Sequence, residues 1–301
     1  MLLYLCYSAL MKFSYFDVHS HLNLSPLFEK RGEVARVMAE RGIGTITVGV
    51  DLATSKQSVE IAETYDNVWA CVGLHPTDSA PSPEAGEGRP EDRGEVWDAL
   101  HELAQHKKVV AIGECGLDYF RGKDEAMIVR QKEIFKKQIE LALEVGKPLM
   151  IHARPSKGTQ DAYEDVLEIL EQYVTTTPAA KRATPPPKGG EEKPHAHFHF
   201  FVGDVAIAER ALAIGCTFSF DGPITFSKDY DEVIKILPLE AVMLETDAPF
   251  AAPAPHRGKT CEPWMVEEMY KKVAELKELP LEVVQKQVQA NVERVFAIKS
   301  E

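Results

Sequence analysis

Several features that define large protein classes are missing from this sequence. Its five cysteines include no Cys-x-x-Cys pair, and their odd number and wide spacing favour reduced thiols in a cytosolic compartment over a disulfide framework. No stretch is long and apolar enough to span a bilayer, and no Gly-x-Gly-x-x-Gly or Walker A pattern indicates a phosphate-binding turn. We therefore expect a soluble, cytoplasmic protein with no membrane attachment.

Positive charge is also scarce. Lys and Arg number 34 against 47 Asp and Glu, which gives a formal net charge of −13 at pH 7. This balance argues against a protein that coats nucleic acid through bulk electrostatics, but it allows an enzyme whose bound cations create a local positive region. Apolar residues make up 45% and charged residues 27% of the 301 residues, which is typical of a globular protein with one large or two small domains.

Three segments do not fit a packed domain. Residues 1–10 are apolar but lack a basic region and a convincing cleavage site, and Met11 follows them directly, so we interpret them as an N-terminal extension. Residues 79–94 and 175–194 are rich in Pro, Gly and charge, which predicts surface insertions rather than a second domain. Residues 11–301 should therefore form a single domain.

Short β-branched and apolar runs alternate with amphipathic helical patterns along the whole chain. We predict strands at 15–22, 45–50, 68–73, 109–113, 148–152, 196–202, 216–220 and 241–246. We predict helices at 29–41, 54–65, 95–106, 125–145, 161–173, 205–213, 230–236, 263–277 and 281–296. Eight strands, each followed by a helix, predict a single (β/α)₈ TIM barrel. A doubly wound open sheet is the alternative, but it would normally have fewer strands and a Gly-rich phosphate turn.

The first strand ends in Asp17, His19 and His21. Side chains two residues apart along a strand point to the same side, so the two imidazoles could bind one metal ion together. The alternative is that this short His-x-His pattern is only surface decoration. Deciding between the two requires further ligands that could reach the same ion.

Polar side chains also follow the other predicted strands. In a TIM barrel the carboxyl ends of all strands meet at one face, where the chemistry takes place. A single histidine at such an end is usually structural, but several histidines and acids on different strands predict a metal centre. The strand ends carry His75, Glu114, His152, Arg154, His197, His199, Glu245 and Asp247.

At these positions the sequence resembles the TatD family of metal-dependent deoxyribonucleases, which are amidohydrolase-like barrels. The resemblance runs from Phe16 to Phe296, and its matching pieces are FDVHSHL, VGLHP, AIGECGLDY, IHAR, HFFVG, LETDAPF and RGKTCEP. It implies two divalent cations bridged by Glu114, the first bound by His19, His21 and Asp247 and the second by His152 and His199. Nitrogen and oxygen ligands suit Mg²⁺, Mn²⁺ or Zn²⁺, and the resemblance favours Mg²⁺.

The remaining residues at the strand ends have more than one possible role. Asp247 could bind metal and also accept the proton of the attacking water, whereas Glu245, expected on the same side, could be that base or could orient a ligand. Arg154 could pair with a phosphate oxygen or form an ordinary surface ion pair. His75 could meet substrate or pack under a loop, and Arg257 could approach substrate from the loop after the last strand.

The resemblance implies a nuclease that removes nucleotides from DNA, in the 3′-to-5′ direction. Two cations about 3.5–4 Å apart activate water and stabilise both oxygens of a phosphodiester displacement. The alternative is hydrolysis of a small ester, lactone or amide at the same centre, and a metal-stabilised scaffold is a third possibility. We expect DNA as substrate, no obligate protein partner, and a monomer or weak oligomer. Four aromatic residues expected near the mouth could stack on bases or belong to the core: Phe120, Phe200, Phe250 and Trp264.

Overall fold

The computed structural model of the chain describes residues 13–77, 94–121, 124–176 and 195–298. The predicted N-terminal extension, residues 1–10, lies outside the described residues. The two predicted insertions also lie outside them, apart from Gly94, which begins a helix, and residues 175–176, which end one.

The described residues contain eight strands that pair in parallel and in the order of the chain. They are β1 Tyr15–Ser20, β2 Ile43–Val48, β3 Val68–Val72, β4 Val109–Asp118, β5 Leu149–Arg154, β6 Ala196–Phe198, β7 Thr217–Phe220 and β8 Val242–Leu244. A parallel bridge between Ser20 and Ala248 joins the segment after β8 to β1. The predicted TIM barrel is therefore confirmed, with β1 next to β8.

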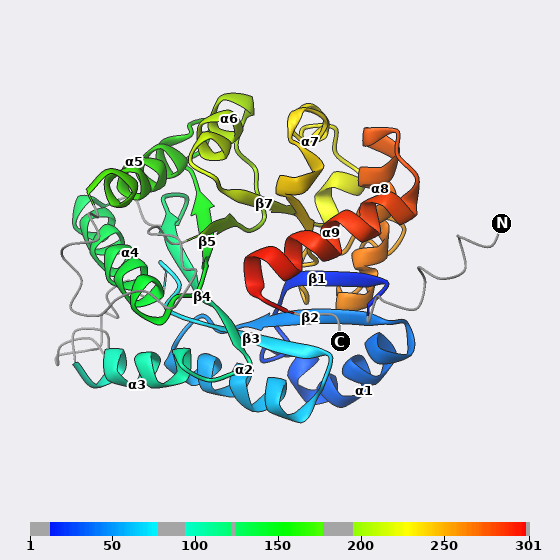
Figure 1. Cartoon of the computed structure of the whole chain (residues 1–301), viewed down its shortest axis with the longest axis horizontal. Helices are drawn as coiled ribbons and strands as arrows, with labels where there is room; N and C mark the ends of the chain where they lie inside the picture. The colour runs from blue at the N-terminus through cyan, green and yellow to red at the C-terminus, as the bar shows by residue number, and fades with distance from the viewer. Residues whose placement is uncertain (1–12, 78–93, 122–123, 177–194, 299–301) are drawn as a thin grey trace.

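Helices surround this barrel (Figure 1). They are α1 Leu27–Glu40, α2 Leu52–Thr64, α3 Gly94–Ala104, α4 Glu125–Val145, α5 Asp161–Thr176, α6 Val205–Ala213, α7 Asp231–Ile236, α8 Val266–Lys277 and α9 Leu281–Phe296. Local signals explain several of their ends: Asp51 forms a capping box with Thr54 at the start of α2, and Gly146, at a φ of 67°, ends α4 in the left-handed conformation. The predicted bounds of α4, α6 and α9 agree with the structure.

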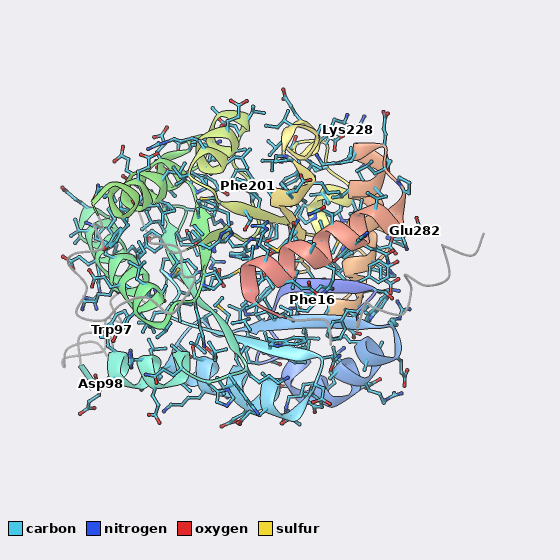
Figure 2. All side chains as sticks on the ribbon, viewed as in Figure 1. Phe16, Trp97, Asp98, Phe201, Lys228 and Glu282 are labelled. Atoms are coloured by element: carbon cyan, nitrogen blue, oxygen red, sulfur yellow. The ribbon has the colours of Figure 1, made fainter. Side chains whose placement is uncertain are left out.

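Apolar side chains pack between the helices and the outer face of the strands. Phe16 and Phe201 are fully buried in this core, whereas Lys228 and Glu282 lie at the periphery (Figure 2). The hydroxyl of Tyr270 on α8 accepts a hydrogen bond from the Phe16 amide (3.0 Å) and donates one to the Phe16 carbonyl (3.1 Å). These contacts fix the start of β1, before the His-x-His pattern, against the helical layer.

The strand ends differ from the predicted bounds in a way that matters for the site. β6 and β8 end earlier than predicted, at Phe198 and Leu244, so the polar residues that follow them lie on loops. β4 instead continues through Glu114 to Asp118. No described helix is long and apolar enough to cross a membrane.

Candidate metal centre

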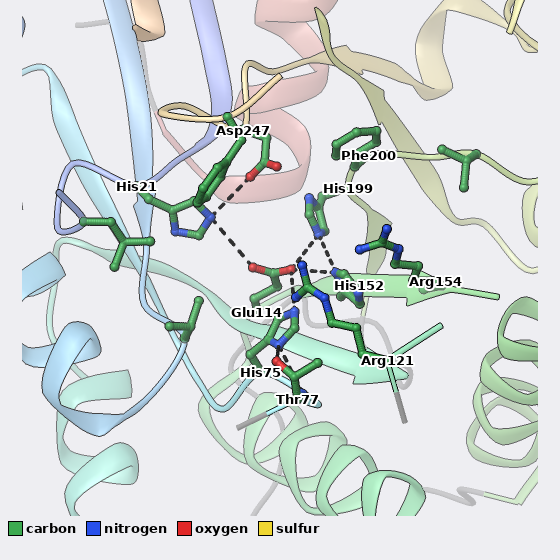
Figure 3. A pocket seen from close by; sticks show the side chains of 15 residues that line it. His21, His75, Thr77, Glu114, Arg121, His152, Arg154, His199, Phe200 and Asp247 are labelled. Carbon is green, nitrogen blue, oxygen red and sulfur yellow. Dashed lines mark hydrogen bonds and ion pairs between the residues drawn. The ribbon is translucent and has the colours of Figure 1, made fainter. Parts of the chain in front are cut away.

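Glu114 lies at the centre of a cluster of histidines at the carboxyl end of the barrel. Its Oε1 is 2.8 Å from both His152 Nδ1 and His199 Nε2. Its Oε2 lies on the other side, 3.6 Å from His19 Nε2 and 3.9 Å from His21 Nε2. Figure 3 shows this carboxylate between His21 and Asp247 on one side and His152 and His199 on the other. Each carboxylate oxygen thus faces a different pair of imidazoles.

The backbone of β4 turns Glu114 into this position. The pairing register between β4 and β5 shifts between Ile112 and Cys115, and such an irregularity re-aims the side chain it contains. Gly113 has a φ of 151°, and a Cβ there would lie 2.4 Å from the Met150 carbonyl oxygen. Only glycine fits at this position, so the Gly-Glu sequence is a local requirement of the site.

The first pair of imidazoles comes from β1. His19 Nε2 and His21 Nε2 are 3.2 Å apart, and Asp247 Oδ1 lies 3.3 Å from His21 Nε2 and 3.8 Å from His19 Nε2. His21 Nδ1 donates a hydrogen bond to the Val48 carbonyl (2.9 Å), so in the neutral ring Nε2 keeps its lone pair. Two zinc-bound nitrogens in tetrahedral geometry lie about 3.3 Å apart. The spacing therefore suits two ligands of one cation.

Asp247 reaches this position through an unusual backbone. Its φ is 51°, in a left-handed region that Asp tolerates better than most residues. Its amide donates to the His19 carbonyl (3.0 Å), and its own carbonyl accepts from the Phe250 amide (2.9 Å). Asp17 fixes the same loop, because its carboxylate accepts hydrogen bonds from the amide and the hydroxyl of Thr246. Asp17 is therefore a support of the loop and does not face the cluster.

The second pair of imidazoles has a carboxylate behind each ring. His152 Nε2 lies 3.3 Å from Asp118 Oδ2, and His199 Nδ1 lies 3.4 Å from Glu245 Oε1. A carboxylate that accepts the proton of one ring nitrogen fixes the tautomer and directs the other lone pair outward, as is typical of metal-binding histidines. The outward atoms, His152 Nδ1 and His199 Nε2, are 3.3 Å apart and both face Glu114.

The charges of these groups suit a divalent cation. With the outer nitrogens protonated, a lone pair and a carboxylate oxygen face each other at 2.8 Å in both contacts with Glu114. This arrangement is repulsive unless a proton or a cation lies between them. Burial alone would raise the pKa of Glu114, but the surrounding histidines, His199 first, outweigh it and lower that pKa well below its usual range. Burial alone would lower the pKa of His199, but Glu114 and Glu245 raise it well above its usual range.

No cysteine of the described residues belongs to this cluster. Cys115 is next to Glu114, but its Sγ lies 3.4 Å from the Met150 carbonyl oxygen. Burial first, and then the charge of Glu114, raise the pKa of this thiol well above its usual value. The nitrogen and oxygen donors suit divalent cations generally.

A cavity of about 580 Å³ opens in front of the cluster. Its lining includes the predicted residues His75, Arg154 and Asp247, but neither Arg257 nor Glu245. The side chains that line it are those of His21, Leu24, Val50, His75, Thr77, Glu114, Arg121, His152, Ala153, Arg154, His199, Phe200, Val202, Asp247 and Phe250. The Arg257 guanidinium instead stacks on the ring of Phe226, at 3.9 Å from its centroid.

The side chains of Glu245 and Asp247 do not point to the same side, contrary to the expectation from strand alternation. Glu245 is fully buried below His199, and its Oε1 accepts the Phe200 amide (2.8 Å), whereas Asp247 lines the cavity. Alternation ends with β8 at Leu244. Of the two carboxylates considered as a base, only Asp247 lies where substrate could reach it.

His75 differs from the other histidines in its tautomer. The Thr77 amide donates a hydrogen bond to His75 Nδ1 (3.1 Å), so in the neutral ring the proton resides on Nε2. That atom lies 3.3 Å from Glu114 Oε1. His75, Glu114 and His152 are close enough together to hold a metal ion, but a protonated nitrogen has no lone pair for one. The tautomer favours His75 as a hydrogen-bond donor on the cavity wall.

Two residues of the site were not predicted. Arg121 lines the cavity from the loop after β4, and its amide donates to Asp118 Oδ1 (2.8 Å). Asp118, the last residue of β4, contacts His152. The available signal was that both residues closely follow Glu114 in the sequence.

Comparison with known proteins agrees with this geometry. The model of the family described as TatD related DNase matches residues 16–297. The chain belongs to this family. An uncharacterized metal-dependent hydrolase of Bacillus subtilis (strain 168), YabD, is 37% identical over 286 residues, which cover 94% of this chain and 99% of that protein. The chain is thus a TatD-family metal-dependent hydrolase.

More distant relatives extend the comparison. A protein of Klebsiella pneumoniae (strain 342) named 3′-5′ ssDNA/RNA exonuclease TatD is 28% identical over 292 residues, which cover 94% of this chain and 98% of that protein. The crystal structure of the TatD homologue YJJV from Escherichia coli K12 superimposes with a TM-score of 0.75 at 23% identity, over 96% of this chain and 100% of that one. At this identity, the structural similarity to YJJV supports the fold but not the function.

Proposed function

We propose that this TatD-family protein is a deoxyribonuclease that hydrolyses DNA phosphodiester bonds in the 3′-to-5′ direction with two divalent cations. The observation that supports it best is the position of Glu114, whose two oxygens face two separate pairs of imidazoles. A bridging carboxylate of this kind is the usual way to hold two ions about 3.5–4 Å apart. The proposed 3′-to-5′ direction of hydrolysis is based on the sequence resemblance and on the name of the Klebsiella relative.

The residues divide into two ligand sets. His19, His21 and Asp247 would hold one ion, and His152 and His199 the other, with Glu114 between them. Bound divalent cations supply acidity to the attacking water and positive charge to the phosphate oxygens. Mg²⁺ is the favoured ion, and Mn²⁺ or Zn²⁺ would fit the same donors.

Asp247 is the residue we assign to proton transfer. Its Oδ1 faces His21 and His19, and we assign Oδ2 to accept the proton of the attacking water. Burial alone would raise the pKa of Asp247, but the neighbouring imidazoles, His21 first, outweigh it and lower that pKa below its usual value. Asp247 is therefore unprotonated at neutral pH, as a general base must be.

The cavity wall offers contacts for phosphate and bases. Arg121 and Arg154 both line it, and a guanidinium can hold two oxygens of a phosphate at once. The Arg154 guanidinium lies 4.2 Å from the centroid of Phe120, which is 47% exposed. Phe250, 53% exposed, lines the cavity beside His21. Exposed aromatic rings next to cations are what single-stranded nucleic acid needs for stacking.

The alternative substrate, a small ester, lactone or amide, would use the same centre. A neutral substrate of that size has no anionic group for two guanidinium groups to bind. The two arginines in the cavity wall therefore favour a phosphodiester substrate. The monomeric or weakly oligomeric state and the cytoplasmic location stay predictions.

End-labelled oligonucleotides test the proposal. The Mg²⁺- or Mn²⁺-loaded protein should shorten a 5′-labelled single strand one nucleotide at a time from its 3′ end. A strand whose last internucleotide linkages at the 3′ end are phosphorothioates is the control and should resist. Stepwise loss from the 5′ end would refute the direction, and hydrolysis of a neutral ester without any cleavage of DNA would refute the nuclease.

A further inference from the structure

A chain of polar side chains runs through the barrel interior below the metal centre. His195 Nε2 lies 3.1 Å from Thr217 Oγ1, and Thr217 Oγ1 lies 2.9 Å from His197 Nδ1. His197 Nε2 lies 2.9 Å from Ser219 Oγ, and Ser219 Oγ donates to Glu245 Oε2. Apart from His195, these residues are at most 1% exposed, and none of the five lines the cavity.

The donors in this chain all point in one direction. A carboxylate oxygen accepts, so the Ser219 hydroxyl donates to Glu245 and must in turn accept the proton of His197 Nε2. In a neutral ring this leaves His197 Nδ1 as an acceptor for the Thr217 hydroxyl. Both nitrogens of a fully buried imidazole are thereby used within the protein, and neither is available to a metal ion.

The chain ends at Glu245, the carboxylate behind His199. Glu245 Oε2 accepts from Ser219, and Oε1 accepts the Phe200 amide (2.8 Å) and faces His199 Nδ1 (3.4 Å). His199 Nδ1 has no hydrogen-bond partner among the described residues, so the charge of Glu245 at 3.4 Å is what favours a proton on this nitrogen and a lone pair on Nε2. Aligned hydrogen bonds in a low-dielectric interior strengthen one another, so the effect of His197 and Ser219 can reach the ligand.

We propose that His197 and Ser219 are positioning residues of the metal centre: they orient Glu245, which orients His199 for the cation that it shares with His152. This inference rests on the two ligand sets of the proposed function, but not on DNA as the substrate. It also assigns Glu245 to orientation rather than to proton transfer, because both of its oxygens accept from protein groups. Loss of a residue that orients a metal ligand typically lowers metal affinity 10–100-fold.

Ser219→Ala tests the chain by removing one buried hydroxyl. A titration with Mn²⁺ in the absence of DNA, monitored by electron paramagnetic resonance, should show that one of the two ions binds 10–100-fold more weakly than in the wild type. The other ion should bind as in the wild type. Ser219→Thr keeps the hydroxyl and should restore the affinity. His197→Phe keeps a ring against Phe296 and should have the same effect as Ser219→Ala.

Tyr270→Phe is the matched control. It also removes one buried hydroxyl and two hydrogen bonds, but between α8 and β1 rather than inside the barrel. It should lower the melting temperature without changing either Mn²⁺ affinity. If Ser219→Ala lowers the melting temperature and leaves both affinities unchanged, the residues only stabilise the fold and the proposal is wrong.

Single-site backgrounds identify the affected ion. In His21→Ala protein, where the ion at His152 and His199 should remain, Ser219→Ala should again weaken binding. In His152→Ala protein it should have no effect on the remaining ion, and a loss there would overturn the assignment. If the variants change Mn²⁺ affinity as expected but the wild-type protein cleaves no DNA, the proposed function is contradicted and this inference stands.

Discussion

Glu114→Gln is the change that tests the centre most directly. The substitution keeps the shape of the side chain but replaces one oxygen by an NH₂ group, which donates protons and cannot bind a cation. The wild-type carboxylate contacts His152, His199 and His75 through Oε1 and faces His19 and His21 through Oε2. Whichever way the amide is oriented, one of the two metal sites loses its carboxylate oxygen and the other keeps only a neutral one.

The structure allows an estimate of the loss. Contacts to charged groups contribute about 1.5–3 kcal/mol each, so the loss of one such contact at each site corresponds to about 3–6 kcal/mol in total. At 1.36 kcal/mol per factor of ten this is a decrease in combined metal affinity of about 10²–10⁴. Hydrolysis of DNA should fall at least as far, because both ions act in the reaction.

Metal content and fold must be measured together. We expect the Glu114→Gln protein to keep its circular dichroism spectrum and gel-filtration volume while it loses bound metal in elemental analysis. Glu275→Gln, at an exposed ion pair with Lys272, is the control and should leave metal content unchanged. If anomalous scattering from Glu114→Gln crystals shows both ions at full occupancy, the bridging role of Glu114 is refuted.

Three further predictions concern other parts of the chain. Arg154→Ala should lower kcat/KM on an oligonucleotide about 10- to 100-fold, as expected for a charge-assisted contact of about 1.5–3 kcal/mol, with metal content and turnover of a neutral ester unchanged; equal losses on both substrates would refute phosphate binding. Asp118→Asn removes the carboxylate that faces His152 Nε2. It should lower the affinity for one of the two Mn²⁺ ions about 10-fold or more, as measured by Mn²⁺ titration. Deletion of residues 179–192 should lower the melting temperature by less than about 5 °C, and a larger decrease in a thermal scan would contradict the prediction of a surface insertion.

The fold and most of the candidate ligands could be predicted because both depend on local pattern. Apolar runs of strand length recur between amphipathic helices, and three helices begin and end where the pattern predicts. A parallel barrel then brings every strand end to one face. The six candidate ligands belong to the ends of five strands and were expected near one another, and the structure places the other five around Glu114.

Prediction was less successful where the backbone departs from regular geometry. The predicted fourth strand ended at Gly113, yet β4 continues to Asp118, and Gly116 to Asp118 pair with β5. Strand alternation placed Glu245 and Asp247 on one side, but the backbone at Asp247 is left-handed. Local sequence contains no signal for either, since each depends on contacts with a neighbouring strand.

The tautomers of the histidines are a still finer property that the sequence does not contain. His21 and His75 have the same side chain and both lie near Glu114, but Val48 offers His21 a carbonyl and Thr77 offers His75 an amide. The first partner leaves Nε2 with a lone pair and the second leaves it with a proton. A single backbone group therefore decides whether each imidazole presents a lone pair, as a metal ligand needs, or a proton, as a hydrogen-bond donor needs. For that reason a motif of histidines predicts a metal centre, whereas the hydrogen-bond partners behind the rings decide which histidines can bind the ion.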